Sequence, residues 1–236
     1  MKNRYNRILL KLSGEGLMGN KPFGVDENIL DEFAESIKKV YEKGISLCVV
    51  IGGGNFYRGV NNANKTISRP VADQAGMLAT IINALFLKSA LNNKGVPSEV
   101  LSGLNVPQAV VPYSYREAQK LLKEKFVLIY AGGTGNPYFT TDTGATLRAL
   151  ESECDALFKA TQVDGVYDSD PKKNPKAKRY KEVSYDEVIA KELKVMDMTA
   201  IAMARENKLP IIVFKQEDRQ SLLNILDGKG NFTIIK

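Results

Sequence analysis

Short apolar runs alternate with longer amphipathic segments along the chain. An apolar run of roughly 4–8 residues that stops at glycine or a polar residue is typical of a buried strand. Segments with apolar residues three or four positions apart, preceded by a capping Asp, Ser or Thr, are typical of helices. This pattern predicts strands at 8–12, 47–51, 126–131, 156–159, 211–214 and 232–235. It predicts helices at 26–44, 73–95 and 114–125, and further helices that begin near Thr141, Ser184, Asp197 and Asp218.

Strands and helices follow one another in turn for most of the chain. Because parallel strands need crossover connections that are usually helical, this order predicts an α/β fold with a mainly parallel sheet and helices on both faces. The sequence has no internal repeat, and its one linker-like stretch, the Pro- and Lys-rich 168–181, is expected to be a surface loop. We therefore expect a single domain over residues 1–236.

Composition narrows the chemistry available to this fold. The 236 residues include no histidine, which excludes Ser-His-Asp hydrolysis and zinc chemistry. Cys48 and Cys154 lie in separate apolar stretches and are expected to be reduced core thiols. The 33 Lys and Arg against 27 Asp and Glu give a net charge of +6, which suits anionic ligands. No unbroken apolar segment approaches the roughly 20 residues that span a bilayer, and no signal peptide follows the N-terminus, so we expect a cytoplasmic protein without a membrane partner.

Residues suited to phosphate binding come directly after predicted strands, where open α/β sheets bind ligands. Lys11-Leu12-Ser13-Gly14 places a cation beside small residues with accessible amides. Lys11 alone is equally well explained as a lysine on an edge strand that reaches solvent. Gly52-Gly53-Gly54-Asn55 offers backbone amides and Arg58 a guanidinium, unless the glycines only form a flexible turn. Neither GxxxxGK[ST] nor GxGxxG is present, which argues against P-loop and dinucleotide-binding folds.

The densest group of unusual residues follows the strand at 126–131. The run GTGNPYFTTD at 133–142 combines turn-forming glycines, hydroxyls, two aromatic rings and a carboxylate at the start of a helix. Thr140, Thr141 and Asp142 each also suit an ordinary helix N-cap. The pattern therefore leaves Asp142 open between a structural and a chemical role.

Two later segments follow the same arrangement. KATQVDGVY at 159–167, with Asp168 and Asp170, either surrounds a nucleoside or forms a polar hairpin. Asp197 in MDMTA at 196–200 is either a helix cap or a carboxylate that faces the site. The basic run 172–181 is most simply a solvated loop, because it nearly lacks the interleaved aromatic residues that stack on bases. Nucleic acid is therefore not an expected partner.

Read together, five segments closely resemble the bacterial UMP kinases of the amino-acid kinase family: KLSGE at 11–15, GGGNFYRG at 52–59, GTGNPYFTTD, KATQVDGVY and MDMTA. The resemblance covers nearly the whole chain. GTGNPYFTTD is specific to UMP kinases, whereas the lysine strand and the glycine triplet occur in other amino-acid kinases. The resemblance implies a three-layer α/β/α sandwich, transfer of a phosphoryl group from ATP to UMP in pyrimidine nucleotide biosynthesis, Mg²⁺ with the ATP, and a homohexamer.

The resemblance also implies a role for each matching position. The ATP phosphates would be held by Lys11, Leu12, Ser13, Gly14, Gly54 and Arg58, with Thr161, Tyr167 and Asp170 on the adenosine side. UMP would be held by Gly53, Asp73, Thr134, Gly135, Asn136, Pro137, Tyr138, Phe139, Thr140 and Thr141. The family's GTP effector region corresponds to Gly19, Asn20, Lys21, Pro22, Phe23 and Gly24. GTP is the expected activator and UTP the expected inhibitor.

Phosphoryl transfer depends mainly on alignment and charge neutralisation, and a UMP phosphate is already ionised near neutral pH, so no strong general base is needed. Lys11 and Arg58 would offset charge on the transferring group, while Asp142 and Asp197 would orient metal or lysine. The sequence does not decide which carboxylate touches Mg²⁺.

Two alternatives stay open. The first is an amino-acid kinase that acts on a carboxylate such as aspartate or acetylglutamate, against which GTGNPYFTTD stands. The second is a non-catalytic sensor of pyrimidine nucleotides that regulates a partner or DNA, against which the retention of Lys11 and Asp142 stands.

Overall fold

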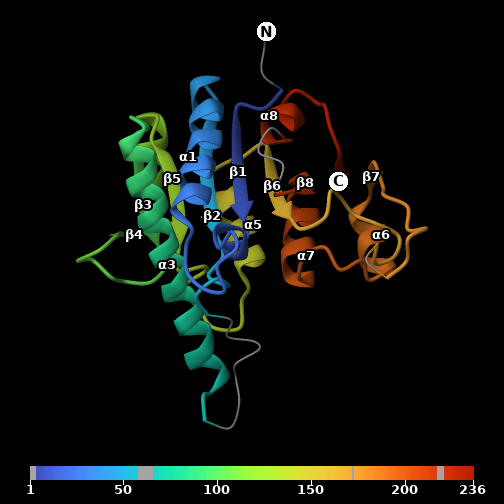
Figure 1. The fold of residues 1–236 in the computed structure, drawn as a ribbon, viewed down its shortest axis with the longest axis horizontal. Helices are drawn as coiled ribbons and strands as arrows, with labels where there is room; N and C mark the ends of the chain where they lie inside the picture. The colour runs from blue at the N-terminus through green and yellow to red at the C-terminus, as the bar shows by residue number, and fades with distance from the viewer. Residues whose placement is uncertain (1–3, 58–65, 172, 217–220) are drawn as a thin grey trace.

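The computed structural model describes residues 4–57, 66–171, 173–216 and 221–236, and its central feature is one sheet (Figure 1). In this part of the chain nine strands lie in the order β4-β3-β5-β2-β1-β6-β8-β9-β7. They are β1 (Arg7–Leu12), β2 (Ser46–Ile51), β3 (Ser98–Ser102), β4 (Val111–Pro112), β5 (Val127–Ala131), β6 (Ala156–Thr161), β7 (Glu182–Val183), β8 (Ile211–Lys215) and β9 (Phe232–Ile235). All strands from β4 across to β8 are parallel, whereas β9 runs antiparallel to β8. The prediction of a mainly parallel sheet is confirmed.

Helices cover both faces of the sheet. The structure has a short 3₁₀ turn, η1 (Gly14–Leu17), and the helices α1 (Glu27–Glu42), α3 (Arg69–Asn93), α4 (Tyr115–Lys123), α5 (Thr141–Glu151), α6 (Tyr185–Ala190), α7 (Met198–Glu206) and α8 (Ser221–Leu226). One hydrophobic cluster joins α1, α3 and α8 to one face, and a second joins α4, α5, α6 and α7 to the other. Figure 1 shows α1 beside α3 on the first face. The expected three-layer α/β/α sandwich is confirmed.

The central strand β1 shows why the sheet needs two helical layers. Successive residues of a strand point to opposite faces. Ile8, Leu10 and Leu12 belong to the hydrophobic cluster of the first face, and Leu9 belongs to that of the second. Apolar side chains on both faces require cover on both faces, as is usual for parallel sheets.

Three short strands and one helix boundary differ from the sequence-based predictions. β3 was not predicted because its apolar residues are flanked by polar Ser98, Glu99 and Ser102, and β4 and β7 have only two residues each. α3 begins at Arg69 rather than near Asp73, since proline is tolerated in the first turn, where backbone N–H groups have no partner within the helix. The helix start expected near Asp218 lies outside the described residues.

Among the described helices, α3 alone is long and apolar enough, by length and composition, to cross a membrane. Its most apolar 18-residue window has a mean hydropathy of 1.3, and 44% of that window is buried inside the fold. A core helix of a soluble protein has the same properties, so this is weak evidence for a membrane span. Cys48 and Cys154 are both buried and free, as predicted.

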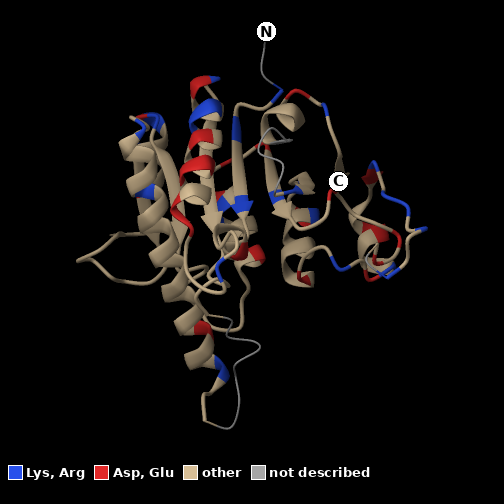
Figure 2. Cartoon of the chain, in the orientation of Figure 1, with Lys and Arg blue, Asp and Glu red and all other residues tan. Residues whose placement is uncertain are grey.

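Charged side chains of both signs are mixed over α1, and basic side chains follow the loop that leads into β7 (Figure 2). This loop is mostly exposed, as expected for a surface loop. Within it Arg179 donates to the carbonyl of Phe232 at 2.5 Å and to the side chain of Asn231 at 3.1 Å. Part of the basic run therefore secures the loop to the end of the sheet. Lys172, at the start of the run, lies outside the described residues.

Candidate active site

The candidate phosphate-binding motifs meet at one edge of the sheet. β1, β2, β5 and β6 are parallel, so their carboxyl ends lie at the same edge. Ser13 and Gly14 follow β1, the glycines at 52–54 follow β2, the segment 132–140 follows β5, and Gln162 follows β6. Motifs that are far apart in the sequence are thereby brought together.

Two lysines and one aspartate form the centre of this edge. Lys11 of β1 and Lys159 of β6 lie directly opposite each other in the strand register. Lys11 Nζ is 2.9 Å from Asp142 Oδ1, while Lys159 Nζ contacts Asp142 Oδ2 and donates to the carbonyl of Val195 at 2.6 Å. Because β1 lies in the middle of the sheet, the alternative of an edge-strand lysine is wrong. Asp142 instead holds two amine groups side by side.

Burial and the neighbouring charges shift the pKa values of Asp142 and Lys159. Burial by itself would raise the pKa of Asp142, but the charges of Lys11 and Lys159 outweigh it and lower this pKa from 3.8 to about 2. Burial is also the main influence on Lys159 and lowers its pKa; Asp142 opposes this effect and Lys11 adds to it. Asp142 is therefore ionised at neutral pH, and one carboxylate faces two amines. Such a cluster favours an anionic ligand.

The N-terminus of α5 separates the alternatives for Asp142 and Asp197. Thr140 is the N-cap, because its hydroxyl accepts from the amides of Asp142 and Thr143 at 3.1 and 3.3 Å. The capping role considered for Asp142 is wrong. Asp197 caps α7 through the amide of Ala200 at 3.0 Å, and it also accepts from the hydroxyls of Thr140 and Thr143 at 2.5 and 2.9 Å. Asp197 is thus both a cap and a carboxylate that faces the start of α5.

Backbone contacts tie the motif after β1 to the motif after β2. A Cβ on Gly14 would lie 2.2 Å from the carbonyl oxygen of Gly52, so only glycine fits there. Next to this contact the buried side chains of Asn55 and Asn83 exchange two hydrogen bonds of 2.9 and 2.7 Å. Asn83 also donates to the carbonyl of Gly52 at 2.7 Å, and Asn55 to that of Gly24 at 3.0 Å. These specific contacts argue against the alternative of a flexible turn.

A cavity of about 730 Å³ opens beside the lysine–aspartate cluster. Lys11, Ser13, Thr161, Tyr167 and Asp170 all line it, so residues expected on the phosphate side and on the adenosine side share one cavity. The segment after β6 borders this cavity, and its end also pairs antiparallel with 178–180 through a bridge between Tyr167 and Arg179, so each of the two interpretations of KATQVDGVY describes part of it.

Leu12 and Gly54 of the expected ATP set do not line this cavity. The side chain of Leu12 is buried in the core of the first face, which leaves only its backbone at the sheet edge. Gly54 lies in the turn after β2 and is half-buried. Arg58 lies outside the described residues.

The residues expected to hold UMP gather at the N-terminal end of α3. Asp73 accepts from Nε of Arg69 at 2.7 and 2.9 Å and from the backbone N–H of Tyr138 at 2.8 Å. These bonds join α3 to the segment 134–141. Gly53 packs against the same helix. The structure thus brings Asp73, Gly53 and the GTGNPYFTTD segment to one region.

The segment 19–24, expected to bind GTP, lies beside the turn after β2. The N–H of Gly24 donates to the carbonyl of Asn55 at 3.0 Å, and the ring of Phe23 is exposed. The first two residues of the segment line a second, smaller cavity of about 290 Å³. This smaller cavity shares Ser13 and Thr161 with the large one.

The sequence-based interpretation did not single out Asn83 or Gln216, and it took Lys159 only as part of KATQVDGVY, without its partner Asp142. Lys159 breaks the apolar run of β6 as Lys11 breaks that of β1, and comparing the two strands gives the signal. Asn83 is a single amide within a largely apolar stretch of α3. Gln216 follows β8 and has no sequence signal beyond its place at a strand end.

The fold and the candidate site define an α/β protein with a cluster of two lysines and one aspartate at the carboxyl edge of a mainly parallel sheet. A model of the amino acid kinase family matches residues 6–215. A uridylate kinase from Hyphomonas neptunium is 51% identical over 234 residues, covering 99% of this chain and 93% of that protein. One from Rickettsia typhi is 50% identical over 233 residues, covering 99% and 96%. The solved UMP kinase from Ureaplasma parvum is 38% identical, with a TM-score of 0.94 and 100% of both chains covered. The chain belongs to the amino acid kinase family and, within it, to the uridylate kinases.

Proposed function

We propose that the protein transfers the terminal phosphoryl group of ATP to UMP, giving ADP and UDP in pyrimidine nucleotide biosynthesis. The observation that carries this proposal is the pair Lys11 and Lys159, which Asp142 holds together beside a cavity of about 730 Å³. The two uridylate kinases at 51% and 50% identity support the choice of substrates.

The lysines serve the transfer by charge. Negative charge moves between the donor and acceptor oxygens during phosphoryl transfer, and fixed cations stabilise it best when they need no rearrangement. Asp142 fixes both lysines before substrates bind, so it is a positioning residue. Asp197 acts one step further away, by holding the start of α5 through Thr140. Arg58 would add a guanidinium from the segment after the glycine triplet.

The two substrates would approach this cluster from opposite sides. ATP would occupy the large cavity, with its phosphates at Lys11, Ser13 and Gly14 and its adenosine near Thr161, Tyr167 and Asp170. UMP would lie between α3 and the segment 134–141, with Asp73 near the ribose hydroxyls. Both reactants would then be held in line at one edge. The loss of translational and rotational entropy would occur on binding, which lowers the barrier of the transfer step.

Kinase membership implies a divalent metal with ATP, and we propose Mg²⁺. The described residues contain no group of three or more His, Cys, Asp or Glu side chains suited to a metal ion. Both oxygens of Asp142 contact lysines, and both oxygens of Asp197 accept hydrogen bonds. Mg²⁺ commonly keeps its waters and binds substrate phosphates rather than a protein cage. Its ligands here are therefore expected to be mainly ATP oxygens and water.

We also propose a homohexamer. Exposed apolar side chains recur along one side of α3, at Val71, Leu78, Ile82 and Phe86. An apolar helix surface of this kind is commonly covered by another subunit.

A cytoplasmic location agrees with the two free cysteines, and a single domain over residues 1–236 agrees with the continuous sheet.

For regulation we propose that GTP activates through 19–24 and that UTP inhibits by resembling the product. The hydrogen bonds between Gly24 and Asn55 support this assignment, since Asn55 is tied through Asn83 to the carbonyl of Gly52. A ligand on the segment would thus act on the turn that faces the phosphates.

The test of the main proposal is a coupled assay of ADP release with UMP, CMP, AMP and aspartate as acceptors. A site built to hydrogen-bond one base rejects partners that leave its buried polar groups unpaired. We expect kcat/KM to be highest for UMP. A preference for CMP or aspartate would contradict the assignment, and tight UMP binding without turnover would favour the sensor alternative.

A further inference from the structure

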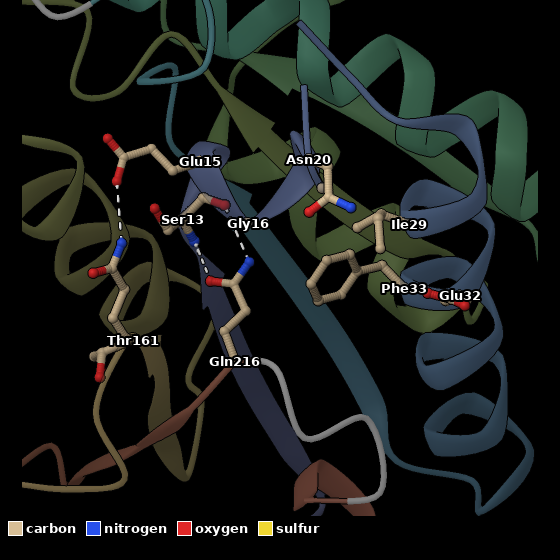
Figure 3. A pocket seen from close by; sticks show the side chains of 11 residues that line it. Ser13, Glu15, Gly16, Asn20, Ile29, Glu32, Phe33, Thr161 and Gln216 are labelled. Atoms are coloured by element: carbon tan, nitrogen blue, oxygen red, sulfur yellow. Dashed lines mark hydrogen bonds between the residues drawn. The ribbon is translucent and has the colours of Figure 1, made fainter. Parts of the chain in front are cut away.

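Gln216, the residue directly after β8, joins two strand ends at the nucleotide cavity. Its side chain is 8% exposed. Its Oε1 accepts from the backbone N–H of Ser13 at 2.9 Å, and its Nε2 donates to the backbone carbonyl of Ser13 at 3.1 Å (Figure 3). Its own backbone N–H donates to the carbonyl of Thr161 at 2.8 Å. One residue thus fixes the end of β1 to the end of β6.

The paired hydrogen bonds set the orientation of two peptide groups. A carboxamide carries a donor and an acceptor, so it satisfies the N–H and the C=O of Ser13 at once. The Ser13 carbonyl and the Gly14 N–H belong to one planar peptide group and point in opposite directions. Holding that carbonyl at Gln216 therefore directs the Gly14 N–H away from Gln216. The Gly14 nitrogen lies beside Gly52, because a Cβ added to Gly52 would be 3.4 Å from this nitrogen.

The surroundings of Gln216 preserve this arrangement. A Cβ on Gly16 would lie 1.8 Å from Nε2 of Gln216, so the absence of a side chain at Gly16 leaves room for the carboxamide. Gln216 borders the smaller cavity, together with Phe33 of α1 (Figure 3). Ser13 and Thr161, its hydrogen-bond partners, line both this cavity and the large one, which Gln216 itself does not border. Gln216 therefore acts on the large cavity through its partners.

We propose that Gln216 is a positioning residue for ATP, which aligns the backbone amides around Ser13 for phosphate binding. This rests on the proposed function only in taking the loop after β1 as the ATP phosphate site. The predicted signature is selective: weaker ATP binding, with UMP binding and folding preserved.

The experiment uses two variants and one matched control. Gln216→Met removes both hydrogen bonds at similar length, and Gln216→Glu keeps the acceptor but places its second oxygen against the Ser13 carbonyl. The control is Gln119→Met, because Gln119 also donates its amide to a backbone carbonyl, that of Glu151 at 3.0 Å, but from α4. Calorimetry measures binding of a non-hydrolysable ATP analogue and of UMP, and the coupled assay measures both KM values.

We expect the Kd of the ATP analogue and the KM for ATP to rise roughly tenfold in both Gln216 variants, the scale of losing two ordinary hydrogen bonds. The UMP values should stay close to those of the unaltered protein, while the melting temperature should fall by a few degrees, because the Ser13 N–H loses its buried partner. Gln119→Met should leave both nucleotides unaffected. Unchanged ATP-analogue binding in both variants would overturn the proposal, and so would an equal weakening for UMP. Because analogue binding is measured without turnover, absence of UMP phosphorylation would count against the proposed function alone.

Discussion

Replacing Asp142 by asparagine removes one charge and keeps the shape of the side chain. The carboxylate faces Lys11 and Lys159, and their charges lower its pKa from 3.8 to about 2 against the opposing effect of burial. A shift of this size corresponds to about 2 kcal/mol of folding stability. Because the folded-state pKa is the lower one, this contribution is fully present above about pH 5 and is lost as pH falls toward 2. About half of it should be gone at pH 3.

Urea denaturation of the unaltered protein and of Asp142→Asn at pH 7 and pH 3 measures this contribution. We expect the variant to be less stable by about 2 kcal/mol or more at pH 7, since two buried amines lose their counter-charge. The difference should shrink by about 1 kcal/mol at pH 3, where the native carboxyl is partly neutralised on unfolding. In the coupled assay kcat should fall roughly 10²-fold, because the lysines are no longer aligned. A stability difference that is the same at both pH values, together with unchanged kcat, would refute the role given to Asp142.

Three further substitutions test neighbouring parts of the site. Lys159→Met should lower kcat roughly 10²-fold in the coupled assay and also lower urea stability, since it leaves one oxygen of the buried Asp142 and the carbonyl of Val195 without a donor; unchanged stability would contradict this. Lys11→Ala should lower kcat by a similar factor with little change in calorimetric UMP affinity, and normal turnover would exclude Lys11 from the transfer step. Asn83→Leu should cost about 2 kcal/mol or more in urea denaturation, because it leaves Oδ1 of Asn55 and the Gly52 carbonyl without the donor that Asn83 supplies. Combining it with Asn55→Leu should cost less than the sum.

Much of the fold followed from the sequence because parallel strands are buried on both faces and appear as continuous apolar runs. The six predicted strands are present, and the candidate site motifs follow four of them, β1, β2, β5 and β6. β3, β4 and β7 were missed because short or polar strands owe their pairing to neighbours in the sheet rather than to their own pattern. Local pattern therefore located the interior of the sheet better than its periphery.

The candidate site was less accessible to sequence-based prediction. Lys11 and Asp142 were identified from their motifs, but Lys159 became visible only through the register of β1 and β6. The role of Asp142 depended on which residue caps α5, a choice among adjacent residues that spacing alone does not make. Gln216 reaches Ser13 across the sheet edge from 203 positions away, a contact that only the folded chain creates.

The two edge strands of the sheet affect how readily copies of this protein can associate through their sheets. β4 and β7 form the edges, and each is two residues long. Pro112 in β4 has no N–H to offer, and Glu182 in β7 pairs with Lys236 at 2.9 Å. Short edges that carry proline or charge give an incoming strand little to bond with, which protects a sheet against growing into aggregates. For the proposed homohexamer, helical surfaces are therefore the expected contacts, and a substitution that lengthens either edge strand is expected to promote insoluble association without disturbing the candidate active site.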